Sequence, residues 1–252
     1  VQRHIQMTPF FTALGWSDHF ADQVSAIEAA ELAPVRLTEV RRNRVIGLDA
    51  DNKRIDLALS GDNVATDMAV GDFVLSDGER LIRVLDRKSV ISRKAAGHTS
   101  QAQLIAANID TLFIVTSCNA DFNEARLERY VALAIEAETT PVIVMTKADM
   151  PLGDPQDYID RALAISNRVQ AVTLNAKDAD DVAKMNDWCG AGQTVALVGS
   201  SGVGKSTIGR TLTGEDLLTA DIREDDAKGR HTTTARSMHL MHAGGWMIDT
   251  PG

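Results

Sequence analysis

The sequence predicts a two-part α/β protein, in which a small closed β-barrel precedes a parallel β-sheet with helices on both faces. Three observations support this prediction. Five short strand-like runs separated by turn residues occupy residues 35–87. Apolar, β-branched runs then alternate with helical stretches from residue 110 onward. The last of these runs leads into a glycine-rich loop at residues 199–207, and a helix is expected to follow.

Composition indicates a soluble globular protein. The 252 residues favour two compact units, and 44% of them are apolar. No run is long enough to span a bilayer, and the apolar start at residues 7–16 is too short for a signal peptide. Cys118 and Cys189 are too few for a disulfide framework or a zinc site. We therefore expect reduced thiols, a cytoplasmic location and no membrane partner.

The first part of the chain is expected to contain an extension and the barrel. Residues 1–34 form an N-terminal extension that is helical in part, with Ser17 as a helix cap. Residues 35–97 form the barrel, whose strand-like runs are VRLTEV, RVIGL, RIDLALS, DFVLS and LIRVLD. Alternating apolar residues predict strands with one face inward, and the OB-fold is the commonest barrel with five strands.

The barrel also differs in charge from the rest of the chain. The net charge is −9, yet residues 35–94 hold twelve basic residues against ten acidic ones. These basic residues are Arg36, Arg41, Arg42, Arg44, Lys53, Arg54, Arg80, Arg83, Arg87, Lys88, Arg93 and Lys94. A basic segment in an acidic chain predicts contact with a polyanion, although any single arginine is more often a solvated surface residue. Because Phe73 is the only aromatic residue in the segment, we expect folded RNA to be bound through phosphates rather than by base stacking.

Residues 98–252 are predicted to form the parallel-sheet domain. Strands buried on both faces alternate here with helices, so helices should cover both faces of the sheet. The strands are expected at residues 111–117, 141–146, 171–175 and 194–199. The helices are expected at residues 123–138, 155–166 and 178–189.

A phosphate-binding loop (P-loop) follows the fourth of these strands. The glycines let backbone amides face phosphates at a helix N-terminus, Lys205 reaches the β- and γ-phosphates, and the Ser206 hydroxyl binds Mg²⁺. A glycine-rich turn that matches by chance is the alternative, and the flanking strand and helix argue against it. The matching residues are Gly199, Ser200, Ser201, Gly202, Val203, Gly204, Lys205, Ser206 and Thr207.

Two polar loops that follow earlier strands are expected to bind the base. The Asp149 carboxylate accepts hydrogen bonds from guanine N1 and the 2-amino group, while the stem of Lys147 lies over the ring. The amide of Ala176 meets guanine O6. The motif Lys-x-Asp is weak alone, but beside a P-loop it predicts GTP and GDP as ligands and argues against ATP. The first base loop is Thr146, Lys147, Ala148 and Asp149, and the second contains Asn175 and Ala176.

Two segments after the P-loop match switch regions. Residues 229–236 form a threonine-rich loop in which Thr233 is expected to bind Mg²⁺. A strand from residue 246 ends in Asp-x-x-Gly, where Asp249 holds Mg²⁺ through water and the Gly252 amide contacts the γ-phosphate. The base loops therefore precede the P-loop and switches, whereas an ordinary small GTPase begins with the P-loop. This order is a circular permutation.

The OB-type barrel, SRKAAG at residues 92–97, AANIDTLFIV at residues 106–115 and the permuted motifs together resemble the RsgA (YjeQ/EngC) family. The resemblance implies a bacterial cytoplasmic GTPase that binds the small (30S) ribosomal subunit and its rRNA. We expect the protein to be a monomer. It also implies faster GTP hydrolysis on the subunit, during late subunit maturation. Members carry a zinc-binding domain after the second switch, so Zn²⁺ is expected only in a domain beyond Gly252.

This sequence departs from the family pattern at two base-loop positions. Thr146 stands where Asn is more frequent, and its hydroxyl can still brace the P-loop, with fewer bonds than an amide offers. Asn175 stands where Ser is usual, a mild change because the backbone contacts the base. The departure at Thr146 bears on affinity more than on base choice.

The catalytic residues are predicted to be Lys205 and His231. In the family, an apolar residue replaces the usual water-positioning Gln, so His231 becomes the candidate that orients the attacking water. A solvated loop residue or an RNA contact is the alternative role for His231. Two other functions compete with a ribosome-dependent GTPase: a GTP-gated RNA-binding module with incidental hydrolysis, and an ATP-using kinase or ATPase, against which Asp149 argues.

Overall fold

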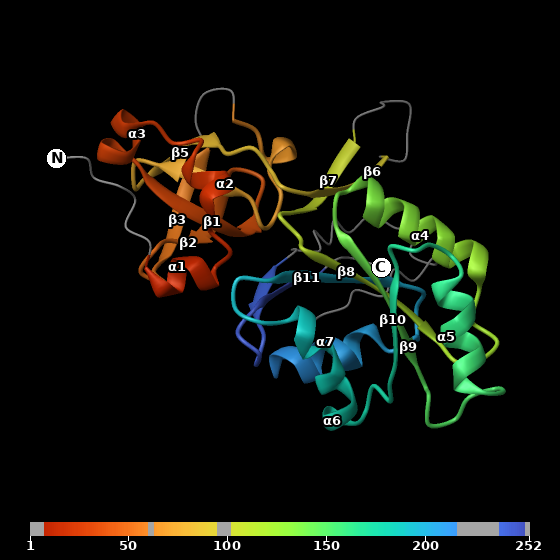
Figure 1. The fold of residues 1–252 in the computed structure, drawn as a ribbon. Coiled ribbons are helices and arrows are strands. Elements are labelled where there is room, and N and C mark those ends of the chain that lie inside the picture. Colours follow the sequence, from red (N-terminus) through yellow and green to blue (C-terminus); the bar gives the residue numbers. More distant parts are fainter. Residues whose placement is uncertain (1–7, 60–62, 95–101, 216–236, 250–252) are drawn as a thin grey trace, which may run out of the picture.

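The structure is a computed structural model that describes residues 8–59, 63–94, 102–215 and 237–249. Figure 1 shows two groups of strands, the barrel in red and orange and the sheet in colours from yellow-green to blue. The barrel comes first in the chain and the parallel sheet second, so the predicted fold class is confirmed.

The barrel is closed by five strands in the order β1-β2-β3-β5-β4, which is the topology of an OB-fold. Its closure rests on the antiparallel pairing of β1 with β4 and on a short parallel pairing of β3 with β5. Its interior contains Val35, Val45, Leu57, Val74 and Leu81. Inward and outward residues alternate as expected in β3, but all four residues of β4 are buried because its other face packs in the core that contains the N-terminal helices. The strands are β1 (Ala33–Val40), β2 (Arg44–Leu48), β3 (Arg54–Leu59), β4 (Phe73–Ser76) and β5 (Arg80–Val84).

A hairpin that the sequence analysis did not predict follows the barrel. Strands β6 (Val90–Lys94) and β7 (Ala102–Ala107) pair antiparallel in a separate two-stranded sheet. The Ala107 amide donates to the Val70 carbonyl at 2.9 Å, which ties the hairpin to the barrel. Strand β6 thus lies in the segment that we assigned to the barrel, but it is not one of the barrel strands.

The second sheet has six strands in the order β10-β9-β8-β11-β13-β12. All neighbours are parallel except β12 and β13, which form an antiparallel hairpin. The four strands predicted from apolar runs are all present; two match at both ends, and the ends of the other two differ by at most two residues. The strands are β8 (Thr111–Ser117), β9 (Thr140–Thr146), β10 (Gln170–Thr173), β11 (Thr194–Gly199), β12 (Met238–Leu240) and β13 (Trp246–Ile248).

Helices cover both faces of this sheet, as predicted (Figure 1). Alternate residues of β8 show why, because Ile114 packs with α4 and α5 while Phe113 and Val115 pack with α6 and α7. The side chains of Asn123 and Asp154 cap α4 and α5. The helices are α4 (Glu124–Glu136), α5 (Pro155–Leu163), α6 (Ala179–Val182) and α7 (Lys205–Thr213).

One predicted helix, at residues 178–189, is wrong in type over most of its length. Only α6 is α-helical, and η2 (Ala183–Trp188), a 3-10 helix, continues it. Asp and Asn side chains compete with the backbone for hydrogen bonds, and this short segment contains several of them. Burial of Met185 then favours the tighter turn over a regular helix.

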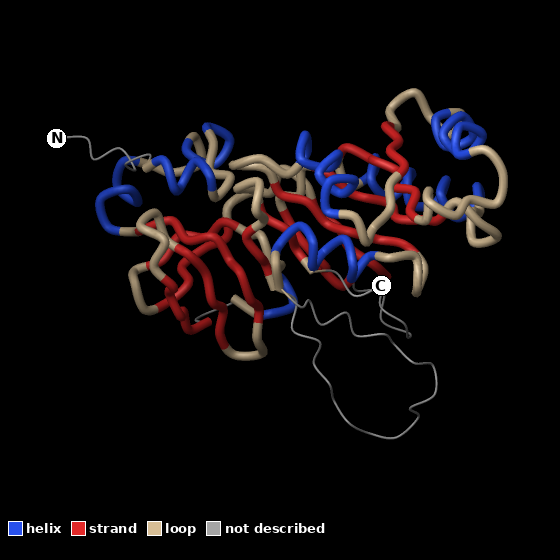
Figure 2. The backbone as a smooth tube through the Cα atoms, turned by 90° about the horizontal axis from the view of Figure 1, so that it is seen from below, coloured by secondary structure: helices blue, strands red, loops and turns tan. Residues whose placement is uncertain are grey.

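The N-terminal segment consists of three short helices rather than one long one. They are α1 (Pro9–Ala13), α2 (Asp18–Ala21) and α3 (Ala26–Glu31). Ser17 occupies the N-cap position of α2 as predicted, but its hydroxyl makes no capping hydrogen bond. Figure 2 shows the barrel and sheet as two groups of strands, with these helices against the barrel.

An aromatic cluster joins these helices to the barrel and sheet. Phe11 stacks on Trp16 with ring centroids 4.8 Å apart, and Phe20 lies 4.4 Å from Phe73 of β4. The same core continues to Trp246 of β13. Because Phe73 is only 1% exposed, it is unable to stack on a base.

Arg36 corrects the list of basic surface residues. Its side chain is 1% exposed and lies between barrel and sheet. The guanidinium donates to the carbonyls of Leu14 and Asn108 and, at 2.8 Å, to the Thr194 hydroxyl. Burial lowers the pKa of Arg36 to about 10, an effect that nearby Asp110 opposes. Arg36 is therefore a structural residue and not an RNA contact.

Candidate nucleotide-binding site

The predicted ligand residues lie at one edge of the six-stranded sheet. The P-loop follows β11, the first base loop follows β9, the second follows β10, and Asp249 follows β13. These strands are parallel, so their carboxyl ends meet at the same edge, where open α/β sheets bind ligands. The loops thus lie at one edge of the sheet although their order in the sequence is permuted (Figure 1).

Glycine geometry shapes the P-loop. A Cβ atom on Gly199, whose φ is +145°, would lie 2.1 Å from the Val115 carbonyl oxygen of β8. Gly202 and Gly204 also have positive φ, at 74° and 106°, and Gly204 is the N-cap of α7. Side chains rarely adopt these conformations, so the loop requires glycine and its backbone amides lead into the N-terminus of α7.

Lys205 lies inside this loop at the first position of α7. Its ammonium group donates to the carbonyls of Gly199 and Ser200, at 2.8 and 2.7 Å. Ser206 follows at the second helical position and is partly buried, while Thr207 is exposed. Ile208 and Leu212 anchor the other face of the helix in the core. The lysine ammonium is therefore held at the loop where phosphates would bind.

The first base loop is attached to the P-loop through Thr146. Its hydroxyl lies 2.6 Å from the Val203 carbonyl and 3.1 Å from the Thr116 carbonyl, and its single proton serves one acceptor at a time. The brace expected of this hydroxyl is therefore present. Lys147 has a φ of 59°, a left-handed conformation that is unusual for a residue with a side chain and is often found at ligand sites.

Asp149 and Ala148 complete that loop. The Ala148 amide donates to the Leu174 carbonyl at 3.4 Å, which places the two base loops side by side. Asp149 is exposed, and within the described part of the chain no group donates a hydrogen bond to its carboxylate. The carboxylate is thus presented toward solvent beside the second loop.

The second base loop has a fixed backbone. The Asn175 amide donates to Asp181 at 2.6 Å, and the Asn175 side chain accepts from the Lys177 amide at 3.0 Å. Hydrogen bonding from Lys184, and then from the Asn175 amide, lowers the pKa of Asp181. A Cβ on Gly204 would contact Thr146 at 3.4 Å and Ala176 at 3.5 Å. The P-loop and both base loops therefore meet at Gly204.

Asp249 belongs to a hydrogen-bond network that the sequence analysis missed. Its amide donates to the Ser237 carbonyl at 3.0 Å. The Ser237 hydroxyl lies 2.7 Å from His239 Nε2, and His239 Nδ1 lies 2.6 Å from a carboxylate oxygen of Glu215. The network joins Glu215, the second residue after α7, to the start of the second switch. No local signal in the sequence indicated this network, because Glu215 and His239 are 24 positions apart.

Burial raises the pKa of the Asp249 carboxyl, and the nearby His239 opposes this effect. A cation at the carboxylate would favour its ionised form and reverse the shift. Among the described residues, no cluster of three or more His, Cys, Asp or Glu side chains could hold a metal ion.

Three predicted residues lie outside the described part of the chain. They are His231, Thr233 and Gly252. The structure therefore brings together the P-loop, the two base loops and Asp249, and it leaves the roles of these three as predictions.

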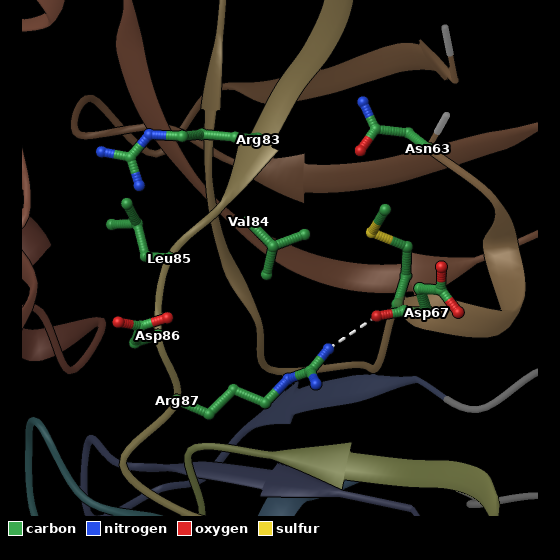
Figure 3. A pocket seen from close by; sticks show the side chains of 8 residues that line it. Asn63, Asp67, Arg83, Val84, Leu85, Asp86 and Arg87 are labelled. Carbon is green, nitrogen blue, oxygen red and sulfur yellow. Dashed lines mark hydrogen bonds between the residues drawn. The ribbon is translucent and has the colours of Figure 1, made fainter. Parts of the chain in front are cut away.

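A groove of about 590 Å³ lies on the barrel, and none of the residues that line it belongs to the predicted nucleotide site (Figure 3). Arg83 at its rim is bound to Glu28 at 2.7 Å, and Arg87 is bound to Asp72 at 2.6 Å. Its arginines therefore serve the barrel and its N-terminal helices. In the described ranges, no helix has the length and apolar content needed to cross a membrane.

Comparison with known proteins identifies the family. The model of the RsgA GTPase family matches residues 84–252. The small ribosomal subunit biogenesis GTPase RsgA of Mesorhizobium japonicum is 51% identical over 251 residues, which cover 97% of this chain and 71% of that protein. RsgA 2 of Vibrio parahaemolyticus is 44% identical over 242 residues, which cover 95% of this chain and 66% of that protein.

Two solved structures share the fold. YjeQ from Thermotoga maritima has a TM-score of 0.64 at 21% identity, covering 88% of this chain and 75% of that one. YloQ, a circularly permuted GTPase, has a TM-score of 0.59 at 22% identity, covering 88% of this chain and 71% of that one. The matched relatives, the permuted site and the barrel agree, and the chain belongs to the RsgA GTPase family.

Proposed function

We propose that this protein binds and hydrolyses GTP during late maturation of the small ribosomal subunit. The observation that carries the proposal is the meeting of the P-loop and both base loops at Gly204, beside Thr146 and Ala176. A phosphate loop and a base loop in contact define the two ends of one nucleotide site. The names of the curated relatives, small ribosomal subunit biogenesis GTPases, support the biological context.

Guanine selection is assigned to Asp149 and the second base loop. The exposed Asp149 carboxylate accepts from guanine N1 and the 2-amino group, and the Ala176 amide donates to O6. The left-handed backbone at Lys147 turns the loop back so that the aliphatic stem of the Lys147 side chain covers the guanine ring. Adenine offers the wrong pattern of donors, and such mismatches commonly cost a factor of about 10⁴.

Mg²⁺ is assigned to the oxygen ligands Ser206, Thr233 and Asp249. Ser206 and Asp249 follow neighbouring parallel strands, and hard oxygen donors suit this ion. When bound, Mg²⁺ would neutralise charge on the β- and γ-phosphates. Lys205 adds a second positive charge, and His231 orients the attacking water.

The partner is proposed to be the small subunit, bound through its rRNA. Exposed arginines of the barrel, including Arg41, Arg44 and Arg54, offer phosphate contacts. Base stacking is disfavoured because Phe73 is buried. We also propose a monomeric, cytoplasmic protein, with Zn²⁺ only in a further domain of the whole protein.

The test is GTP hydrolysis by the full chain with and without purified bacterial small ribosomal subunits, with ATP as the control nucleotide. Strong stimulation by the subunit with ATP inert is the expected result. Binding of GTP without stimulation would favour the GTP-gated RNA-binding module. Equal use of ATP would overturn the role of Asp149.

A variant tests the proposed role of His231. His231→Ala should lower turnover at least about 100-fold, the usual scale for loss of an acid–base or positioning group, with little change in GTP affinity. Single-turnover hydrolysis and equilibrium nucleotide binding measure the two quantities. Unchanged turnover would move His231 to the group of solvated or RNA-contacting residues.

A further inference from the structure

The barrel and the nucleotide-binding sheet share a main-chain contact. Strand β12 lies at the end of the six-stranded sheet, and Ser237, directly before it, forms an isolated antiparallel bridge with Glu39 of β1. Glu39 pairs on its other side with Ile46 of β2. Backbone pairing therefore runs from the barrel wall into the hairpin that carries the second switch.

Ser237 connects this contact to the proposed magnesium ligand. Its carbonyl accepts the Asp249 amide at 3.0 Å, and its hydroxyl lies 2.7 Å from the ring of His239. The opposite ring nitrogen lies 2.6 Å from Glu215, which follows the P-loop helix. A displacement of Ser237 would thus change the hydrogen bonds that position Asp249 and the segment after α7.

The side chain of Glu39 faces the basic surface of the barrel. Its two oxygens hold Arg41 at 2.7 Å and Arg54 at 3.2 Å. The two arginine side chains are 54% and 63% exposed, whereas that of Glu39 is 21% exposed. Exposed ion pairs are weak, and phosphate competes well for guanidinium groups because it accepts two parallel hydrogen bonds.

We propose that Glu39 couples RNA binding on the barrel to the nucleotide site. RNA phosphates take Arg41 and Arg54 from the Glu39 carboxylate, and the like charge of the phosphates then displaces Glu39. The β-bridge transmits this displacement to Ser237 and so to Asp249. The inference rests on the proposed function, since it explains how contact with rRNA reaches the switch that binds Mg²⁺.

Coupling between two binding sites is reciprocal and measurable. The affinity of a fluorescent, non-hydrolysable GTP analogue is determined with and without saturating small ribosomal subunits. The ratio of the two dissociation constants is the coupling factor, which is typically about 5 or more when two sites communicate. Glu39→Gln keeps the size of the side chain and removes its charge, so it releases both arginines without moving the β-bridge.

Glu39→Gln should reduce the coupling factor to below about 2 and strengthen subunit binding at moderate salt. Asp56→Asn is the matched control. Asp56 of β3 holds Arg44 at 2.9 Å, and its side chain is 46% exposed compared with 21% for Glu39. Its backbone pairs with Ile46 and not with the six-stranded sheet. That variant should strengthen subunit binding and keep the wild-type coupling factor.

A second measurement, hydrogen exchange, does not depend on nucleotide affinity. Subunit binding should change hydrogen exchange of the Asp249 amide in the wild type and leave it unchanged in Glu39→Gln. The double variant Arg41→Gln with Arg54→Gln should weaken subunit binding and also lose the coupling, which covers the case of a Glu39 variant that fails to fold.

The outcomes separate this inference from the function on which it rests. If the wild-type coupling factor persists in Glu39→Gln and in the double arginine variant, the role of Glu39 is overturned but the proposed function is not. Equal loss in Asp56→Asn would show a general charge effect and overturn it as well. A wild-type protein that neither binds the subunit nor responds to it would overturn the proposed function together with the inference.

Discussion

The nucleotide edge of the sheet and the contact between barrel and sheet are built by different means. At the nucleotide edge, backbone geometry does most of the positioning, through glycines with positive φ and a hydroxyl on the Val203 carbonyl. At the contact, large side chains dominate, among them the aromatic cluster and the buried Arg36. The first region can therefore lose function without losing its fold, whereas the second should lose stability first.

The largest expected effect is a loss of activity at the P-loop that leaves stability nearly unchanged. Lys205→Ala should lower GTP hydrolysis by about 10²–10³-fold, because one preorganised donor to the reacting phosphates is lost. The unfolding midpoint should change little, since Lys205 is partly exposed and its ammonium donates to carbonyls of the loop itself. Hydrolysis assays and urea unfolding test both expectations. A large loss of stability would contradict the comparison.

The contact between barrel and sheet should respond in the opposite way. Arg36→Met should lower the free energy of unfolding by about 3–5 kcal/mol, the cost of removing one member of a buried charged network. It would leave the carbonyls of Leu14 and Asn108 without this donor and would remove one of the two cations near Asp110. Denaturant unfolding measures the loss, with Arg41→Met as an exposed control. Equal stability of the two variants would place Arg36 outside the supporting core.

The brace between base loop and P-loop should give a smaller effect. Thr146→Val removes the hydroxyl from Val203 and Thr116 at nearly constant volume, at a cost of about 1–3 kcal/mol. The affinity for GTP should fall by about tenfold for each 1.4 kcal/mol lost from the bound state. Thr146→Asn, which adds an amide donor, should bind GTP at least as tightly as the wild type in the same titration. Weaker binding by the asparagine variant would argue against this brace.

The smallest effect concerns acid stability of the N-terminal helices. A hydrogen bond from Arg83, followed by bonds from Ser25, lowers the pKa of Glu28 from 4.5 to about 2. Because this pKa is lowered in the folded state, the ionised Glu28 carboxylate stabilises the fold above pH 4.5, and this contribution is lost as the pH falls toward about 2. Glu28→Gln should therefore flatten the pH dependence of the unfolding midpoint in this window. The change should be slight because solvent screens the interaction between Glu28 and Arg83. Glu31→Gln, in the same helix, is the control.

Local motifs determined the order and chemistry of the nucleotide site. A P-loop requires a strand, a glycine turn and a helix in immediate succession, so residues 199–207 and their flanks carried that information by themselves. The base loops follow buried strands, and parallel strands bring their carboxyl ends to one edge. The circular permutation could thus be predicted from Thr146–Asp149 preceding Lys205 in the chain.

Only the tertiary structure decided which residues join the barrel to the sheet. Arg36 looked like one more basic residue of a strand, and its burial depends on Leu14, Asn108 and Thr194, which are far apart in the sequence. The bridge from Glu39 to Ser237 likewise joins residues nearly two hundred positions apart. Periodicity reports the neighbours of a residue along its own helix or strand. Packing between distant elements sets burial, charge pairing and coupling, and no local pattern encodes them.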